Sequence, residues 1–195
     1  MLLWLGGWHV SMSARKAAGR GLPRRVMAAL GSAMFFVLAP GVVAGVVPWW
    51  LTDFRFGTPL PWWDAVRVPG VVLTIAATTI VVIAFAHFVV EGVGTPAPVA
   101  PTQHLVVGGV YRFVRNPMYL AVVGAIIGQA LFLGQPVLLQ YAAVVGLLMA
   151  AFARWVEEPL LLERFGAEYE AYRRAVPGWW PRPRPWSPRT PGGSS

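Results

Sequence analysis

Long uncharged stretches limit the folds open to this chain more than any other feature of the sequence. Residues 120–153 contain no charged side chain, residues 26–51 contain none either, and residues 68–90 form a third apolar run. About 20 apolar residues in a helix cross a hydrocarbon core that is about 30 Å thick. The pattern therefore predicts an all-α fold, a polytopic bundle of membrane-spanning helices.

Composition agrees with this class. Of the 195 residues, 56% are hydrophobic and 12% are charged, and the mean hydropathy is +0.58. A soluble domain carries about twice that share of charge. The length fits one domain. The absence of cysteine excludes disulfides, thiolate metal ligands and a cysteine nucleophile.

Four spans are expected, with a fifth left open. They cover residues 26–51, 68–90, 117–134 and 137–156. The third begins at Pro117, where the missing N–H costs nothing. Gly134-Gln135-Pro136 reads as a tight turn that joins the last two spans into a hairpin. Residues 94–101 read as an irregular, Pro-rich connection.

Basic residues predict the orientation. The net charge of +8 comes mainly from residues that precede the first span or follow the last: Arg15, Lys16, Arg20, Arg24, Arg25, Arg164, Arg173, Arg174, Arg182, Arg184 and Arg189. Basic flanks on apolar spans remain on the cytoplasmic side, whereas a nucleic-acid surface would not be divided in this way. We expect an integral protein of a bacterial-type inner membrane, with both termini cytoplasmic and no nucleic-acid partner.

The chain divides into three expected parts. Residues 1–25 form a basic cytoplasmic segment, residues 26–181 the membrane domain, and residues 182–195 a Pro- and Arg-rich tail that we expect to be disordered. Basic residues follow the apolar residues 1–10, the wrong order for a secretory signal peptide, and Met12 is an alternative start. Residues 160–174 predict a cytoplasmic amphipathic helix interrupted near Gly166.

Aromatic residues gather around the loop between the first two spans. Trp49, Trp50, Trp62 and Trp63 predict an aromatic belt at one membrane interface, a more common arrangement than an aromatic substrate box. A lone histidine near the end of a span, His87, is more often hydrogen-bonded inside a bundle than a ligand.

Two polar segments flank the uncharged hairpin, and the fold would bring them together at one membrane surface. The second contains Arg154, Glu157 and Glu158, and carboxylates at the mouth of an apolar bundle are costly unless they meet a cation. One interpretation is an interfacial ion pair with Arg154. The other is a carboxylate that binds a cationic ligand while Arg154 orients an anionic one. Adjacent helical residues point about 100° apart, so the two glutamates should have different partners.

The first polar segment, residues 108–119, contains Arg115-Asn116-Pro117. Pro117 disfavours the α conformation at Asn116, and a helix start of this kind can receive a carboxylate or phosphate. Arg112 and Arg115 could alternatively be plain interfacial anchors. The sequence lacks the spacings of a metal site, a Ser-His-Asp triad, a P-loop or a dinucleotide fingerprint. No metal is therefore expected.

Residues 109–119, Gly-Val-Tyr-Arg-Phe-Val-Arg-Asn-Pro-Met-Tyr, resemble the Gly-x-Tyr-x-x-x-Arg-His-Pro-x-Tyr motif of the isoprenylcysteine carboxyl methyltransferase and phospholipid methyltransferase superfamily. Glu157-Glu158, residues 165–172 and Val176-Pro177 are similar to the second signature of the same family. The resemblance covers residues 103–181, in the same order and spacing, and this part would be catalytic.

The resemblance implies S-adenosylmethionine as cofactor and methyl transfer to a lipophilic, membrane-associated acceptor at the cytoplasmic face. Glu157 or Glu158 would meet the cofactor's ammonium or ribose, and Arg154 would face the acceptor, which makes Arg154 and Glu157 the implied catalytic residues. The remaining implied cofactor-binding residues are Gln103, His104, Leu105, Val106, Tyr111, Arg115, Asn116, Pro117, Met118 and Tyr119.

Asn116 departs from the motif, in which histidine is frequent. An amide cannot take a proton at neutral pH, so this position cannot serve as a base. A carboxylate acceptor like that of isoprenylcysteine, the first choice, needs no base; a phospholipid amine or a small thiol would, and a small acid is a further option. The alternative function is a non-catalytic assembly or accessory factor. A transporter is disfavoured because the spans lack charge at mid-depth.

Overall fold

The computed structural model describes residues 39–92 and 105–187, with the side chains of 88–92 excepted. Residues 1–25, the first part of the expected first span, the connection at 94–101, Gln103, His104 and residues 188–195 lie outside this description. All regular structure in the described ranges is helical, which confirms the predicted all-α fold. The elements are η1 (Val42–Val46), α2 (Val47–Thr52), α3 (Asp64–Gly92), η2 (Gly109–Arg112), α4 (Pro117–Leu133), α5 (Pro136–Phe152), η3 (Ala153–Glu157) and α6 (Glu158–Ala175).

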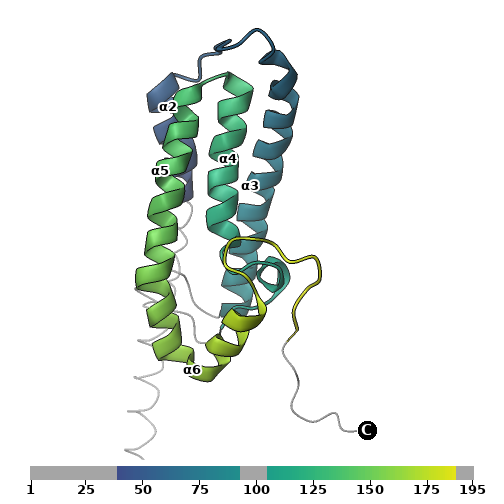
Figure 1. Cartoon of the computed structure of the whole chain (residues 1–195), viewed down its shortest axis with the longest axis vertical. Helices are drawn as coiled ribbons and strands as arrows, with labels where there is room; N and C mark the ends of the chain where they lie inside the picture. Colours follow the sequence, from purple (N-terminus) through teal and green to yellow (C-terminus); the bar gives the residue numbers. More distant parts are fainter. Residues whose placement is uncertain (1–38, 93–104, 188–195) are drawn as a thin grey trace, which may run out of the picture.

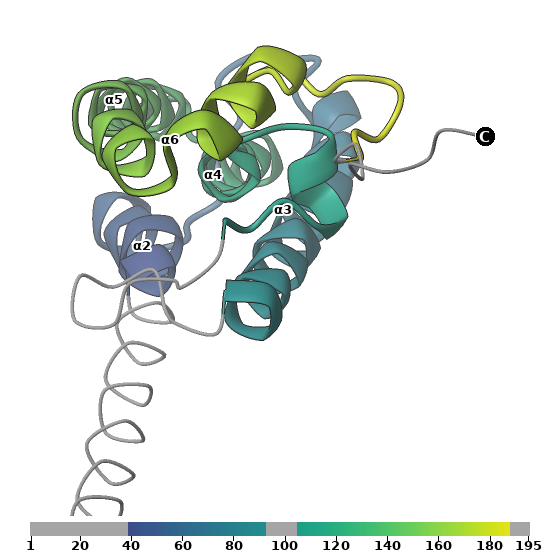
Figure 2. The ribbon, with the colours of Figure 1, turned by 90° about the horizontal axis from the view of Figure 1, so that it is seen from below.

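The long helices stand side by side, with α4 between α3 and α5 and with α2 next to α5 (Figure 1). The loop from α2 to α3 closes one end of the bundle. Helix α6 and η2 lie at the other end, where α6 crosses beneath α4 (Figure 2). The two polar segments, which the sequence predicted to come together, therefore lie at the same end of the bundle.

Length and composition make two helices suitable for crossing a membrane, one over Asp64–His87 and one that starts at Pro136. The helices Ala39–Thr52 and Pro117–Leu133 are apolar but shorter. The large hydrophobic side chains that are exposed on α3 and α5 are nearly all Val, Ile and Leu. A continuous apolar exterior of this kind is typical of a membrane-associated bundle. The number of spans stays a prediction.

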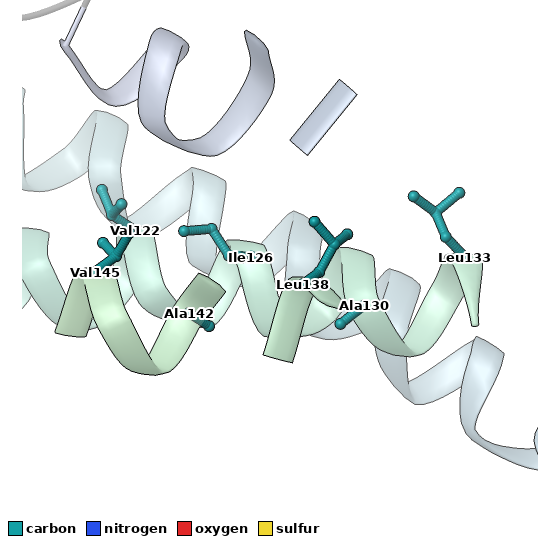
Figure 3. Close-up of a cluster of buried hydrophobic side chains, with 7 residues drawn as sticks. All are labelled: Val122, Ile126, Ala130, Leu133, Leu138, Ala142 and Val145. Carbon is teal, nitrogen blue, oxygen red and sulfur yellow. The ribbon is translucent and has the colours of Figure 1, made fainter. Parts of the chain in front are cut away.

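The predicted hairpin is confirmed by the α4–α5 core (Figure 3). Gly134 ends α4 in the left-handed conformation, with φ 69°, and Pro136 starts α5 after it. Small and branched side chains interdigitate along the pair, and Ile126 and Leu138 are fully buried. The buried residues of this core are Val122, Ile126, Ala130, Leu133, Leu138, Ala142 and Val145.

Helices α3 and α4 are in backbone contact at one level and separate toward the polar end. A Cβ added to Gly70 would lie 2.6 Å from the backbone nitrogen of Phe132 and 2.8 Å from the carbonyl oxygen of Gly128. At Gly124, one turn closer to the polar end, an added Cβ would lie 3.5 Å from the Cβ of Ala77, an ordinary contact. Glycine is thus required at the close crossing and not at the open end.

The first turn of α3 and the residue before it bind the last carbonyls of α4, which have no partner within their own helix. Arg67 donates to Phe132 O at 2.7 Å, and the indole of Trp63 donates to Leu131 O at 2.9 Å. This arrangement corrects two predictions. Helix α3 starts at Asp64 rather than at residue 68. Arg67 therefore lies in the first turn of α3, and its bond to Phe132 O ties this turn to α4. Trp63 is buried and does not belong to the aromatic belt, in contrast to exposed Trp49, Trp50 and Trp62.

A π-helical turn, η1, precedes α2 and leaves backbone carbonyls without their usual partners. Side chains of the neighbouring helices supply the donors. The amide of Gln129 donates to Ala44 O at 2.7 Å, and the phenol of Tyr141 donates to Val43 O at 2.9 Å. These bonds fix the first helix against α4 and α5.

The fourth helix continues where the sequence predicted an end at residue 156. A second π-helical turn, η3, leads without a break into α6, because Pro159 takes a place in the first turn of α6, where proline is tolerated. The predicted interruption at Gly166 is confirmed. Its φ of 48° and ψ of −121° bend α6, and glycine accepts such a conformation.

The expected disorder of residues 182–195 is wrong for the part that the structure describes, residues 182–187. The backbone N–H groups of Arg182 and Trp186 donate to the carbonyls of Phe113 and Arg112, each at 3.0 Å. The ring of Trp186 also packs on Tyr172 at a centroid distance of 5.4 Å. A low-hydrophobicity composition predicts disorder only where no neighbouring surface supplies such partners.

Candidate functional site

The two polar segments are bound together through the turn that follows α6. The N–H of Arg115 donates to Pro177 O at 2.9 Å, and the side-chain amide of Asn116 donates to Gly178 O at 3.1 Å. Asn116 has φ −114° and ψ 54°, outside the α region as Pro117 predicted. Its side chain gives α4 no cap. In this sequence Asn116 therefore holds the 176–178 turn, a task that does not require a titratable group.

Arg115 is at the centre of this connection. Its Nη1 lies 3.0 Å from Glu158 Oε1 and 3.0 Å from the phenol oxygen of Tyr169, and its Nε donates to Val176 O at 3.0 Å. The side chains of Arg115 and Glu158 are both only 15% exposed. All three donor contacts point to α6 or to its end, so Arg115 joins the start of α4 to the C-terminal segment.

Glu158 is neutralised by three arginines. Besides Arg115, the guanidinium groups of Arg154 and Arg173 lie 3.5 Å and 3.6 Å from its Oε2. The three positive charges together compensate the single negative charge of this partly buried carboxylate. Arg154 is paired with Glu158 and not with Glu157, and its side chain is 66% exposed. Of the two residues implied as catalytic, Arg154 therefore faces outward from the cluster.

Two tyrosines of α6 complete the contact with the first polar segment. Tyr172 donates to Tyr111 O at 2.7 Å, and burial raises the pKa of Tyr172. Burial also raises the pKa of Tyr169, against the opposing effect of the neighbouring Arg115. Tyr169, Tyr172 and Val176 form a buried cluster on which Leu105 packs.

Glu157 has a different environment, as the 100° rotation between neighbours predicted. Tyr119 donates to its Oε1 at 2.5 Å. Within the described part of the chain, Glu157 forms no ion pair with a basic side chain. Trp179 stacks on Tyr119 with a centroid distance of 6.4 Å and planes 19° apart. Glu157 is thus a half-buried carboxylate, held by a tyrosine that belongs to an aromatic pair, and it is available to a cation.

The other residues implied by the resemblance lie in apolar clusters around this site. Val106 and Tyr111 are buried with Ala84 of α3, and Met118 packs on them. Pro117 starts α4 on the side that faces α3. The ring of His87 occupies the place of a side chain at Gly109, whose φ is 51°, so His87 lies in a contact inside the bundle.

Sequence reasoning missed three residues at this site. Trp179, which stacks on Tyr119, was not identified as a site residue. Tyr169 and Gly178 were not singled out, and a Cβ at Gly178 would lie 3.2 Å from Arg115 Nη2. All three residues follow Glu158 in the sequence. The helix bends at Gly166, and the chain after it reaches the start of α4, where Pro177 O and Gly178 O accept from Arg115 and Asn116.

An apolar helical bundle with a polar, charged cluster at one end is typical of a membrane-associated protein. The model of the phospholipid methyltransferase family matches residues 65–168, and the chain belongs to this family. The match contains the residues from Tyr111 to Tyr119 as well as Glu157 and Glu158, and confirms the resemblance seen in the motifs. The comparison with curated proteins gave no match. The family suggests membrane methyltransferase activity.

Proposed function

We propose that this protein transfers a methyl group from S-adenosylmethionine to a lipophilic acceptor at the cytoplasmic face of the membrane. The observation that carries the proposal is Glu157, a half-buried carboxylate that accepts a hydrogen bond from Tyr119 and has no cation beside it in the described residues. An ionised carboxylate at the mouth of an apolar bundle is costly without a cation. A ligand with a positive charge would lower that cost.

The residues present fit S-adenosylmethionine, whose ammonium and sulfonium are cationic. Glu157 would hold one of these charges, Tyr119 would keep the carboxylate oriented, and the faces of Tyr119 and Trp179 would favour a cation by their quadrupoles. When bound, the cofactor supplies an electrophilic methyl group. The protein's part is alignment and exclusion of water, which are the main needs of this reaction.

Glu158 and Arg115 have a positioning role in this proposal. Their ion pair fixes the start of α4 and the 176–178 turn around Glu157. Arg154 is exposed on one side of the cluster and is the residue that would face the acceptor, where its charge suits a phosphate or carboxylate. We keep Gln103 and His104 as proposed cofactor contacts on the resemblance alone.

The family description supports a lipid acceptor, and a phospholipid amine now ranks beside the isoprenylcysteine carboxylate that the sequence favoured. A carboxylate acceptor needs no base. An amine must lose a proton, and the Asn116 amide, which donates to Gly178 O, has no capacity to take it. Arrival of the acceptor as a free amine, or a proton shared with Glu157, would meet this need.

We further propose that the protein is integral to a bacterial-type inner membrane, with four spans and with the site and both termini in the cytoplasm. The placement of the basic residues supports this orientation. Addition of a membrane-impermeant thiol reagent to single-cysteine variants tests it, because the chain contains no cysteine of its own. Labelling of position 171 from outside intact cells would contradict the orientation.

Calorimetric titration of the detergent-solubilised protein tests the cofactor proposal. Loss of a hydrogen-bonded charge contact costs about 1.5–3 kcal/mol, so Glu157→Gln should weaken binding roughly 10- to 100-fold. Glu163→Gln, an exposed carboxylate on α6, is the matched control and should bind as the unmodified protein does. Equal affinity in both variants would refute the assignment of Glu157.

Comparison of two ligands shows which charge Glu157 meets. S-adenosylhomocysteine retains the ammonium but lacks the sulfonium charge. A loss of affinity for both ligands in Glu157→Gln would indicate the ammonium, and a loss for S-adenosylmethionine alone would indicate the sulfonium. If a folded, monodisperse sample bound neither ligand, the non-catalytic accessory role would replace this proposal.

A further inference from the structure

An apolar groove of about 330 Å³ lies between α3 and α4 at the polar end of the bundle. Every residue that lines it is apolar, and among them are Leu73, Ala76, Ala77 and Ile80 of α3. A volume of this size is at the lower end of that found for small-ligand sites.

The groove follows from the way in which α3 and α4 pack. The helices touch through Gly70 and Gly128, then separate toward the polar end, where the facing side chains are Ala77 and Gly124. These small groups leave the widening space unfilled. Phe113 and Pro181 close the groove at its polar end.

The groove is separate from the Glu157 site. On α4, Ala121 and Gly124 line the groove, while Tyr119, two residues before Ala121, points about 160° away from it at 100° per residue. Tyr119 makes its hydrogen bond to η3, which continues α5, on the opposite side of α4. A ligand in the groove would therefore have α4 between it and Glu157.

The groove opens onto the apolar exterior of α3. Its rim residues Leu73 and Ile80 are 37% and 39% exposed, and beside them Val72 and Ile75 are exposed still further. In a membrane-associated bundle this surface faces hydrocarbon, and lipid tails are the ligands available to it. A flexible alkyl chain fits a narrow groove that has no polar group.

Positive charge gathers at the closed end. Arg112 immediately precedes the lining residue Phe113, and Arg182 immediately follows the lining residue Pro181 and donates its N–H to Phe113 O. The guanidinium of Arg112 donates to Trp186 O and Ser187 Oγ, and that of Arg182 donates to Ala175 O, so these partners are neutral and do not compensate the two charges. Arg184 lies two residues further along and is exposed. Basic residues where an apolar groove meets the membrane surface attract lipid phosphates.

We propose that this groove binds one acyl chain of an anionic phospholipid, whose phosphate lies beside Arg112, Arg182 and Arg184. The lipid is a second ligand, distinct from the methyl acceptor. It fills the gap between α3 and α4 and supports residues 110–117 from the side opposite to Glu157. The proposal depends on membrane association and not on methyl transfer.

Photo-crosslinking in lipid nanodiscs tests the groove. The probe is a phosphatidylglycerol with a diazirine in one acyl chain, and mass spectrometry locates the adducts. Groove peptides from α3 and α4 should be labelled more strongly than the α5 peptide around Val144, which is exposed on the bundle exterior. Equal labelling would show that only bulk lipid is in contact and would overturn the proposal.

A pair of substitutions distinguishes the effect of filling the groove from a general loss of folded protein. Ala76 is exposed and lines the groove, so Ala76→Phe should reduce groove labelling to the level of the α5 peptide. Ala143→Phe makes the same change at an exposed position of α5 and should leave the labelling unchanged. Unchanged labelling in Ala76→Phe would overturn the proposal.

The charged end has its own test. An arginine near the membrane surface contributes about 1 kcal/mol, so Arg184→Gln should reduce the preference for phosphatidylglycerol over phosphatidylcholine roughly five-fold. Arg174→Gln, whose guanidinium is paired with Glu170, is the control. A preference that does not change in Arg184→Gln would refute the position of the phosphate.

A measurement of cofactor binding shows whether the lipid-groove proposal or the proposed methyltransferase function has failed. Ala76→Phe should bind S-adenosylhomocysteine normally. If this variant bound the cofactor but lost methyl transfer to the lipid acceptor, the groove would be the acceptor site and the proposed second site would be wrong. A crosslink from a probe at position 76 to another part of the chain would likewise refute a lipid occupant.

Discussion

The ion pair between Arg115 and Glu158 joins the start of α4 to α6, and its removal should be among the most destabilising single changes at the polar end. Arg115→Met keeps the length of the side chain and deletes the charge and all its donors. Glu158, Tyr169 and Val176 O would each lose a partner. The C-terminal segment would then be held mainly by apolar contacts.

The magnitude follows from the remaining partners of Glu158. Breaking a buried ion pair by deleting one partner costs about 3–5 kcal/mol. Arg154 and Arg173 stay at 3.5 Å and 3.6 Å, but they are 66% and 42% exposed. Exposed pairs each return only about 0.2–1 kcal/mol. A net loss of about 3 kcal/mol is expected, which lowers the Tm by roughly 6–12 °C for a chain of this size.

A double-mutant cycle with Glu158→Gln measures the coupling. The double variant has no unpaired carboxylate, so it should be about 2 kcal/mol more stable than the sum of the single effects predicts. Thermal unfolding in one detergent, followed by intrinsic fluorescence and by loss of the monodisperse peak in size-exclusion chromatography, gives the comparison. Additive effects, within about 0.5 kcal/mol, would refute the reasoning.

Three further predictions concern the fold. Gly134→Ala should lower the Tm more than Gly166→Ala, because both glycines have a positive φ that strains alanine, but only the Cβ at Gly134 would also overlap the Gly57 carbonyl. Tyr172→Phe leaves the buried Tyr111 carbonyl without its donor and should cost about 1–3 kcal/mol in thermal unfolding, whereas no loss would exclude that bond. Amide hydrogen exchange at Arg182 and Trp186 should be slower than in a free peptide of the same sequence, and equal rates would restore the expectation of a disordered tail.

Much of the site was predictable because it depends on local rules. Pro117 forces Asn116 out of the helical conformation, and a 100° rotation gives Glu157 and Glu158 different partners, as the structure shows. The bend at Gly166 followed from glycine in an amphipathic pattern. Proximity of the two polar segments followed from the hairpin, whose two legs return the chain to one end.

Partner identity could not be predicted in the same way. The sequence places Arg154 one helical turn before both glutamates, yet the π-helical turn η3 gives Arg154 to Glu158 alone. The resemblance implies Arg115 as a cofactor contact, which stays a prediction, and the structure adds its hydrogen bonds to Tyr169, Val176 O and Glu158. The first choice depends on a local departure from α-helical geometry, and the second on contacts between residues 43 to 61 positions apart, which no local rule contains.

The sequence by itself determined the helical membrane class, the hairpin and the family, because uncharged runs, prolines and motif spacing can be read along the chain without knowledge of tertiary contacts. Only the tertiary structure decided that Trp63 and Arg67 bind the end of α4, and that the Arg182–Ser187 segment packs on η2. The physical reason is the same for the contacts at the end of α4 and for the packing of the C-terminal segment on η2. An exposed backbone carbonyl or an unpaired charge takes whichever donor the packing of distant segments brings within reach.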